Sequence, residues 1–93
     1  MNEESYFKQY RQLNTSATDY VVFDIPASFL DYGERTTVTR SIESYEQNNE
    51  ELPIKGEYAV LTNPKGFPVA IAKIEQVAVA IPNVEVKVKV IFV

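Results

Sequence analysis

The sequence predicts an α+β domain whose sheet forms a small closed or half-closed barrel of about five strands. Helical spacing of apolar side chains occurs only in the first third of the chain. From residue 58 onward, runs rich in β-branched residues alternate with Pro, Gly and Asn turns, and residues 84–90 alternate valine with charged residues. Because 93 residues are the length of one domain, we expect a single domain over residues 1–93.

The first half of the chain predicts two helices and two strands. Residues 2–13 form a helix with Asn2 as the N-cap and a stripe of aromatic residues that packs on the core. Residues 20–23 form a strand. Pro26 and Gly33 fit the first position and the left-handed C-cap of a short second helix, which ends just before a strand at residues 36–41. The polar residues 42–52 are expected to form a long mobile loop with room for a helical turn.

The second half predicts strands alone. A strand at residues 58–62 leads into a type I turn at residues 63–66. The strand region at residues 68–81 is so long that it requires a bend or a bulge. A turn at residues 82–83 precedes the alternating strand 84–90, and a closing strand of the barrel would bury the apolar residues 91–93.

Composition narrows the classes of function. No apolar run reaches the length of a membrane span, and the acidic N-terminus lacks the features of a signal peptide, so we expect a cytoplasmic protein with no membrane partner. The absence of Cys and His excludes thiol catalysis, a Ser-His-Asp triad and the usual zinc sites. Glutamates at residues 43–51 lack the pattern of a calcium loop. We therefore expect no metal and no cofactor.

The charge is unevenly distributed. The net charge is −4, with four basic and ten acidic side chains in residues 1–51 against five basic and three acidic in residues 52–93. This balance does not fit a non-specific nucleic-acid binder, whose affinity depends on many phosphate contacts. A small local basic site is compatible with it.

The stretch at residues 33–40 is the best candidate for such a site. It carries two guanidinium groups and three threonine hydroxyls. Side chains alternate along a strand, so Thr36 and Arg40 should face one side and Arg35, Thr37 and Thr39 the other. One of these polar rows is the candidate contact for an anion or a nucleotide. The alternative is an edge strand with solvated arginines.

Four motifs, in this order and spacing, resemble the ASCH domain family. They are Gly-x-[Lys/Arg]-Thr-x-x-Thr at residues 33–39, Tyr-Glu at 45–46, Leu-Pro-x-x-Gly-[Asp/Glu]-Tyr at 52–58, and Pro-Val-Ala-Ile at 68–71. The resemblance implies a PUA-like β-barrel with flanking helices and a cleft beside it that binds RNA or a nucleotide. It also implies a possible chemistry, because one bacterial branch of the family removes the acetyl group from N4-acetylcytidine with a lysine, a threonine and a glutamate.

This chain departs from that catalytic pattern at each position. The lysine position holds Arg35, which keeps its charge and cannot exchange a proton as a tuned lysine does. The threonine position holds Val38. The family's acidic helical segment before the last strand is replaced by residues 82–83, which leaves no counterpart for the glutamate. The chain therefore resembles an abridged member in which binding is favoured over hydrolysis.

Three functions follow from these observations. The first is an RNA- or nucleotide-binding module in which arginines contact phosphate, threonines donate hydroxyls and a tyrosine stacks on a base. Its expected ligand-binding residues are Arg35, Thr36, Thr37, Thr39, Arg40, Tyr45, Tyr58 and Lys73. The second is an amidohydrolase of N4-acylated cytidine-type nucleosides, with Thr37 or Thr39 as nucleophile assisted by Lys73 or Glu75. The third is a protein-interaction domain without a ligand, with a possible homodimer formed through the last strand.

Overall fold

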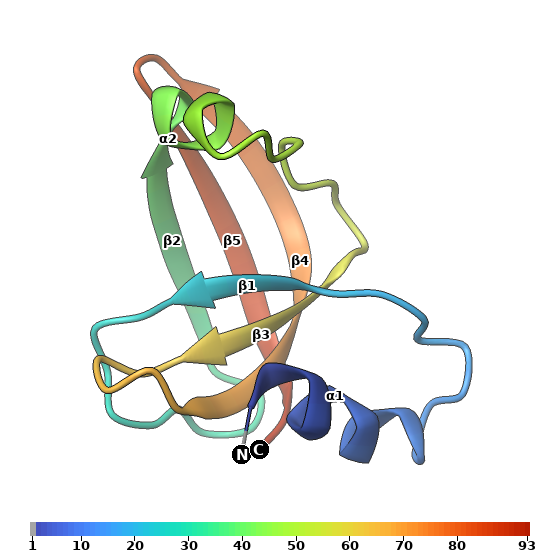
Figure 1. Cartoon of the computed structure of the whole chain (residues 1–93). Helices are drawn as coiled ribbons and strands as arrows, with labels where there is room; N and C mark the ends of the chain where they lie inside the picture. Colours follow the sequence, from blue (N-terminus) through green and yellow to red (C-terminus); the bar gives the residue numbers. More distant parts are fainter. Residues whose placement is uncertain (1) are drawn as a thin grey trace.

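The structure, a computed structural model, describes residues 2–93 and contains seven elements in that range (Figure 1). In chain order these are α1 (Glu3–Arg11), β1 (Val21–Asp24), β2 (Arg35–Ser41), α2 (Ile42–Gln47), β3 (Tyr58–Thr62), β4 (Pro68–Ala80) and β5 (Asn83–Phe92). The five strands form one curled sheet in the order β1-β3-β4-β5-β2, with β1 parallel to β3 and the other pairs antiparallel. The α+β class and the half-barrel predicted from the sequence are confirmed.

The sheet curls because β4 bends. Its register against β5 shifts between Ile71 and Ala72 and again between Ile74 and Gln76, so the predicted irregularity of the long strand is confirmed. Residues 68–73 of β4 pair with β3, and residues 71–80 pair with β5. The barrel does not close, because β1 and β2 each have one neighbour and leave their outer edges free.

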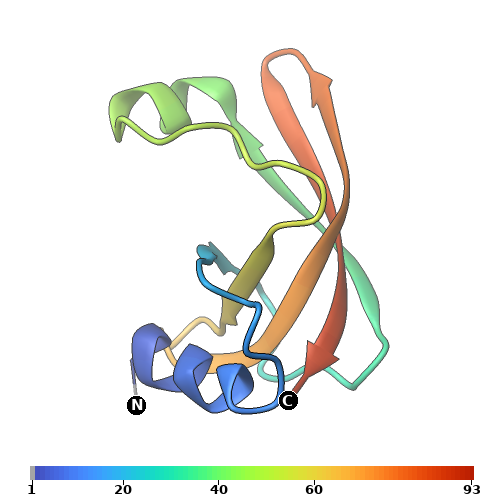
Figure 2. The same cartoon turned by 90° about the vertical axis from the view of Figure 1, so that its right-hand side faces the viewer.

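Two hydrophobic clusters lie on the two faces of this sheet. The larger one fills the concave face with alternate residues of β5 (Val84, Val86, Val88, Val90) and apolar residues of β1, β3 and β4. The smaller one packs α1, through Phe7 and Tyr10, onto the opposite face of β3 and β4. Figure 2 shows α1 and α2 at opposite ends of the molecule. Within residues 2–93, neither helix has the length or apolar content required to cross a bilayer.

The N-terminal helix is confirmed, with Asn2 as its cap accepting a hydrogen bond from Ser5 N at 2.8 Å. The predicted short helix before the central motif is wrong, because residues 26–33 contain bends and a turn. Backbone groups there bond to neighbouring strands instead: Ile25 N donates to Thr62 O at 2.8 Å, and Gly33 N donates to Val90 O at 2.9 Å. These partners replace the bonds that a helix would make internally.

The second helix lies after the motif, where a mobile loop with room for a helical turn was expected. In α2 the side chain of Ser41 accepts a hydrogen bond from Ser44 N at 3.1 Å, which caps the first turn. Tyr45, on the inner side of α2, is only 3% exposed and belongs to the larger cluster. A six-residue helix is too short to be stable alone, so this burial holds it in place.

The end of the chain differs from expectation in two ways. Ile91 and Phe92 are partly buried against α1, but Val93 is 57% exposed. The last strand also has β2 on one side and β4 on the other. The homodimer contact expected through this strand does not fit that arrangement, since the free sheet edges belong to β1 and β2.

Candidate functional site

The open seam of the half-barrel forms a cleft of about 520 Å³. Its walls are the two free edge strands, and α2 with the chain that follows it covers one end (Figures 1 and 2). The lining residues are Val22, Phe23 and Asp24 from β1, Val38, Thr39 and Arg40 from β2, and Ser44, Asn48 and Glu50 from α2 and beyond. The volume lies within the range of small-molecule sites. We call this site the β1–β2 cleft.

Arg40 is the best-held side chain of the cleft. Its Nε donates to Ser44 Oγ at 2.9 Å, and its Nη2 pairs with Glu50 Oε2. The guanidinium lies over the ring of Tyr45, with Cζ 4.2 Å from the ring centroid. The Arg40 side chain is 24% exposed, so this cation is fixed by three contacts while part of it still reaches the solvent of the cleft.

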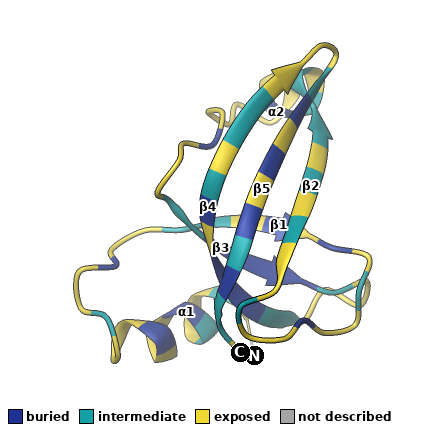
Figure 3. Ribbon diagram, turned by 180° about the vertical axis from the view of Figure 1, so that it is seen from behind, coloured by how far each residue is buried: buried dark blue, intermediate teal, exposed yellow. Residues whose placement is uncertain are grey.

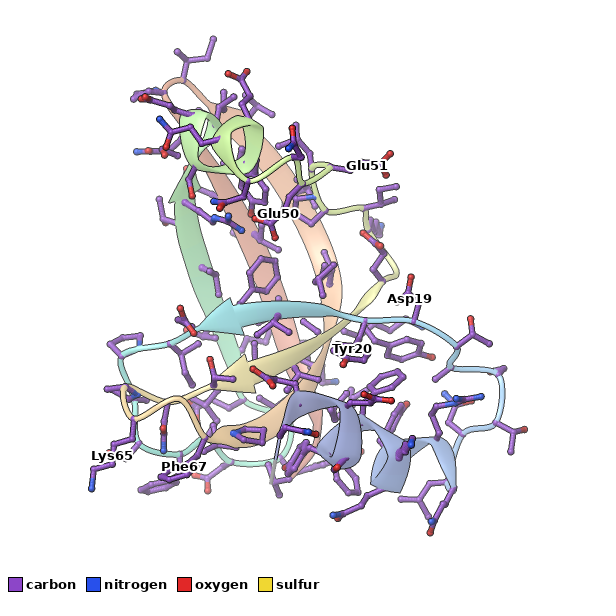
Figure 4. The ribbon with its side chains drawn as sticks, viewed as in Figure 1. Asp19, Tyr20, Glu50, Glu51, Lys65 and Phe67 are labelled. Carbon is purple, nitrogen blue, oxygen red and sulfur yellow. The ribbon has the colours of Figure 1, made fainter. Side chains whose placement is uncertain are left out.

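The ion pair between Arg40 and Glu50 perturbs both groups. The hydrogen bond from Arg40 lowers the pKa of Glu50, and the same bond raises the pKa of Arg40. Figure 4 shows Glu50 directed into the space between α2 and β1, whereas the neighbouring Glu51 points away from it. Both charges of the pair are therefore retained at neutral pH at the edge of the cleft.

Tyr45 lies beneath this pair with an unusual hydroxyl. Its oxygen is buried and makes no hydrogen bond of normal geometry within residues 2–93. Burial raises the pKa of this phenol, against the opposing effect of Arg40, so the group is a neutral phenol. Because Arg40 covers one face of a ring that is 3% exposed, Tyr45 offers no free face on which a base could stack.

The β1 wall adds an acidic and an apolar surface. Asp24, which is exposed, accepts a hydrogen bond from Thr62 Oγ1 at 2.5 Å, and this bond orients its carboxylate. Phe23 is 4% exposed and forms part of the lining together with Val38 from the opposite strand. The cleft thus has a mainly polar lining, with one guanidinium and two carboxylates beside a smaller apolar surface, which suits a neutral ligand that has both donors and acceptors.

The eight residues expected to bind a ligand occupy three separate places. Arg40 and Tyr45 meet at the β1–β2 cleft, and Thr39 borders it, although the Thr39 side chain projects to the face of β2 opposite Arg40. Arg35, Thr36 and Thr37 line a second hollow of about 200 Å³ with Glu75, Gln76 and Lys87. Tyr58 and Lys73 lie in a third place.

Neither of the two outlying places joins the cleft. Arg35 Nε donates to Glu75 Oε1 at 2.8 Å on the convex face of the sheet, so its charge is engaged there. Tyr58 packs against α1, and its hydroxyl accepts a hydrogen bond from Asn14 Nδ2 at 3.0 Å. Lys73 Nζ lies 5.6 Å from the centroid of the Tyr58 ring. The structure does not bring the eight residues together in one cleft.

Sequence reasoning missed the other four polar residues of the cleft lining: Asp24, Ser44, Asn48 and Glu50. Three of them belong to residues 42–52, which were expected to form a long mobile loop. The sequence does carry one local signal for this contact. Arg40 and Ser44 are four residues apart, on either side of Ser41, which caps the start of α2. Asp24 enters the cleft only because β1 pairs with β3, and its short sequence carries no sign of that partner.

Among residues 2–93 no group of three or more Asp and Glu side chains is placed to hold a metal ion. Of the groups considered for hydrolysis, Thr37 and Thr39 project to the convex face, where Thr37 and Glu75 share the smaller hollow. The arrangement in the cleft is one of fixed donors and acceptors beside a small apolar surface.

Comparison with known proteins agrees with this fold. The family model described as the ASCH domain matches residues 5–92 of the chain. Neither the curated proteins nor the solved structures gave a significant match. At the level of the family, RNA binding or a related function is indicated. The family model covers nearly the whole sequence, and the curled sheet with its two helices is that of a PUA-like domain. The chain therefore belongs to the ASCH domain family.

Proposed function

We propose that the protein is an RNA- or nucleotide-binding module and that the β1–β2 cleft receives the base of one nucleotide. The observation that carries this proposal is the fixed guanidinium of Arg40, held by Ser44, Glu50 and Tyr45 at the edge of a cleft with a mainly polar lining. A preorganised donor loses little conformational freedom on binding, so its hydrogen bonds contribute more to affinity. The membership in the ASCH family supports the same class of ligand.

The charges favour a base over a phosphate in this cleft. Glu50 already compensates Arg40, and Asp24 adds a second carboxylate to the lining. A phosphate would meet this negative charge, whereas a base edge offers both donors and acceptors. Carboxylates accept hydrogen bonds from the exocyclic amino group of cytosine, and guanidinium N–H groups donate to carbonyl oxygens and ring nitrogens. Cytidine is therefore the first probe.

The test is an amide-resolved NMR titration of the labelled protein with cytidine and with N4-acetylcytidine. We expect shifts for residues of the cleft, centred on residues 38–50, and an acetyl signal that stays intact. Arg40→Gln should abolish the shifts. Arg35→Gln serves as the matched control, because it removes the other guanidinium of the same strand on the opposite face and should bind as the wild type does.

Other results would change the assignment. If both arginine variants lose the same amount of nucleoside affinity, the affinity depends on the general charge of the protein and not on the cleft. Release of acetate would support the hydrolase alternative. If neither the nucleosides nor a short RNA perturbs the spectrum, the binding proposal is wrong and an interaction domain with only the family's fold is the better description.

A further inference from the structure

A row of cations crosses the convex face of the sheet. In the ladder, Arg35 of β2 is opposite Lys89 of β5, and Lys89 is opposite Lys73 of β4. Residues directly opposite one another project to the same face, where neighbouring strands lie about 4.8 Å apart. Lys87, two residues from Lys89, adds a further cation to this face, opposite Thr37 and Gln76. We call Arg35, Lys73, Lys87 and Lys89 the convex row.

Carboxylates compensate the convex row only in part, although Glu85, opposite Thr39 of β2, projects to the same face. Glu75 pairs with Arg35 at 2.8 Å, and no ion pair to Lys73, Lys87 or Lys89 is found in the part of the chain that the structure describes. Like charges directly opposite in a sheet are destabilising. The chain as a whole carries a net charge of −4, so this local excess of cations opposes the general balance of the protein.

The fold also places a further lysine beside the row. At the bulge of β4, Gly56 N donates to Ile74 O at 2.8 Å, and Ile74 N donates to Glu57 O at 2.9 Å, which brings the segment before β3 alongside β4. The result is a hollow of about 740 Å³ whose lining includes Lys55, Lys73 and Lys89. Three lysines from three separate segments therefore line one open groove, together with the carboxylate of Glu75.

This face is accessible over its upper part. Figure 3 shows β4, β5 and β2 from behind with exposed bands along each strand and no helix across them, while α1 lies at the lower end of the sheet. The side chains beside the row on β2 are Thr37 and Thr39, both exposed. A protein partner or a membrane would require a larger apolar centre than these residues provide.

We infer that the convex row binds the phosphate backbone of a single-stranded RNA whose base occupies the β1–β2 cleft. The inference rests on the proposed function. Strand β2 connects the two sites, because Val38, Thr39 and Arg40 line the cleft and the three residues before them line the hollow that contains Lys87. An RNA strand that leaves the cleft needs only to cross this free edge strand to reach the cations. Backbone contacts of this kind position the ligand without reading its sequence.

The experiment compares two double variants that each remove two lysines. Lys73→Gln/Lys89→Gln alters the convex row, and Lys8→Gln/Lys65→Gln removes the same charge elsewhere. Lys8 lies on α1 with Glu4 3.8 Å away, and Figure 4 shows Lys65 on the turn before β4. The affinity for a labelled oligocytidine RNA is measured by fluorescence anisotropy between about 50 and 200 mM salt. The affinity for free cytidine is measured by NMR.

We expect the convex-row variant to bind the RNA about tenfold more weakly at low salt, with the slope of log K against log salt reduced by about 1.4 for two lost phosphate contacts. Its affinity for cytidine should be unchanged, and the control variant should match the wild type in both assays. Equal weakening in both double variants, or an RNA affinity no higher than that for cytidine, would overturn the inference while leaving the cleft intact. Binding of anionic vesicles in place of RNA would also overturn it. If the wild type does not bind cytidine, the proposed function and the inference are both wrong.

Discussion

The buried hydroxyl of Tyr45 allows a test of the site that needs no ligand. The side chain is 3% exposed, and the hydroxyl makes no hydrogen bond of normal geometry within the described residues. A buried hydroxyl without a partner costs about 1–3 kcal/mol of desolvation free energy. Tyr45→Phe removes this cost and keeps the ring under Arg40. We therefore expect the substitution to raise the free energy of unfolding.

The size of the gain follows from two opposing effects. The nearby guanidinium attracts the phenol oxygen and offsets part of the desolvation cost, so the net gain should be about 1 kcal/mol. For a chain of this length, that corresponds to a rise in Tm of about 4–8 °C. Urea unfolding followed by far-UV circular dichroism measures it, and the m-value should be unchanged because both proteins bury the same surface.

Tyr10→Phe is the matched control for this experiment. Tyr10 is also buried, at 9% exposure, but its hydroxyl accepts a hydrogen bond from Asn14 Nδ2 at 3.0 Å. Removing this hydroxyl should destabilise the protein by about 0.5–1.5 kcal/mol. Each variant lacks one phenol oxygen, and the free energies of unfolding of the two variants should change in opposite directions. If Tyr45→Phe unfolds at a lower urea concentration than the wild type, the hydroxyl has a stabilising partner and the argument is refuted.

Three further substitutions test the charges and the central glycine. Glu50→Gln should make stability less dependent on pH in acid. The pKa of Glu50 is lowered in the folded state, so its contribution to the free energy of unfolding is present above its ordinary pKa of 4.5 and is lost as the pH falls through the lower folded value. Thermal unfolding at a series of acidic pH values would show this. Lys89→Gln should stabilise the protein by about 0.2–1 kcal/mol at low salt, because Lys89 is opposite both Arg35 and Lys73, and the gain should shrink as salt is added. Gly33→Ala should cost about 1–2 kcal/mol in urea unfolding, since Gly33 has φ +82°; a neutral result would show that the loop adopts another conformation.

The elements that sequence reasoning predicted correctly carry their signals locally. The strict alternation of residues 84–90 identifies β5, and the turn at residues 63–66 is fixed by Asn63, whose side chain accepts from the backbone of Lys65 and Phe67 at 3.0 Å. The capped aromatic stripe identifies α1. In each case neighbouring residues alone determine the conformation.

The elements that were missed depend on distant partners. Residues 26–33 contain a good helical start and a left-handed glycine, but Ile25 and Leu30 are buried in the core and the backbone bonds to other strands. Conversely, α2 is short and polar, and it is ordered by the burial of Tyr45 and by the contact of Arg40 with Glu50. Local propensity is weaker than these long-range interactions in both segments.

The site was predicted in part for the same reason. Alternation along β2 correctly separates Arg40 from Arg35, since a period of two assigns them to opposite faces. Which face is concave depends on the place of β5 between β2 and β4, and the sequence of β2 contains no information about that order. The prediction of one site that contains both arginines therefore combined residues that lie on opposite faces of the sheet.

This separation bears on how a polyanion would approach the protein. Glu50 lines the end of the cleft near α2, and Glu43, Glu46 and Glu51 belong to the same segment of the chain, while the opposite face of the sheet carries the convex row. A negatively charged strand is repelled from the first surface and attracted to the second, and salt weakens both effects beyond about 8–10 Å. Encounter should therefore begin on the convex face, and the base should enter the cleft afterwards across the edge of β2. On this reasoning, removing the cations slows association of RNA, whereas Arg40→Gln mainly speeds its dissociation.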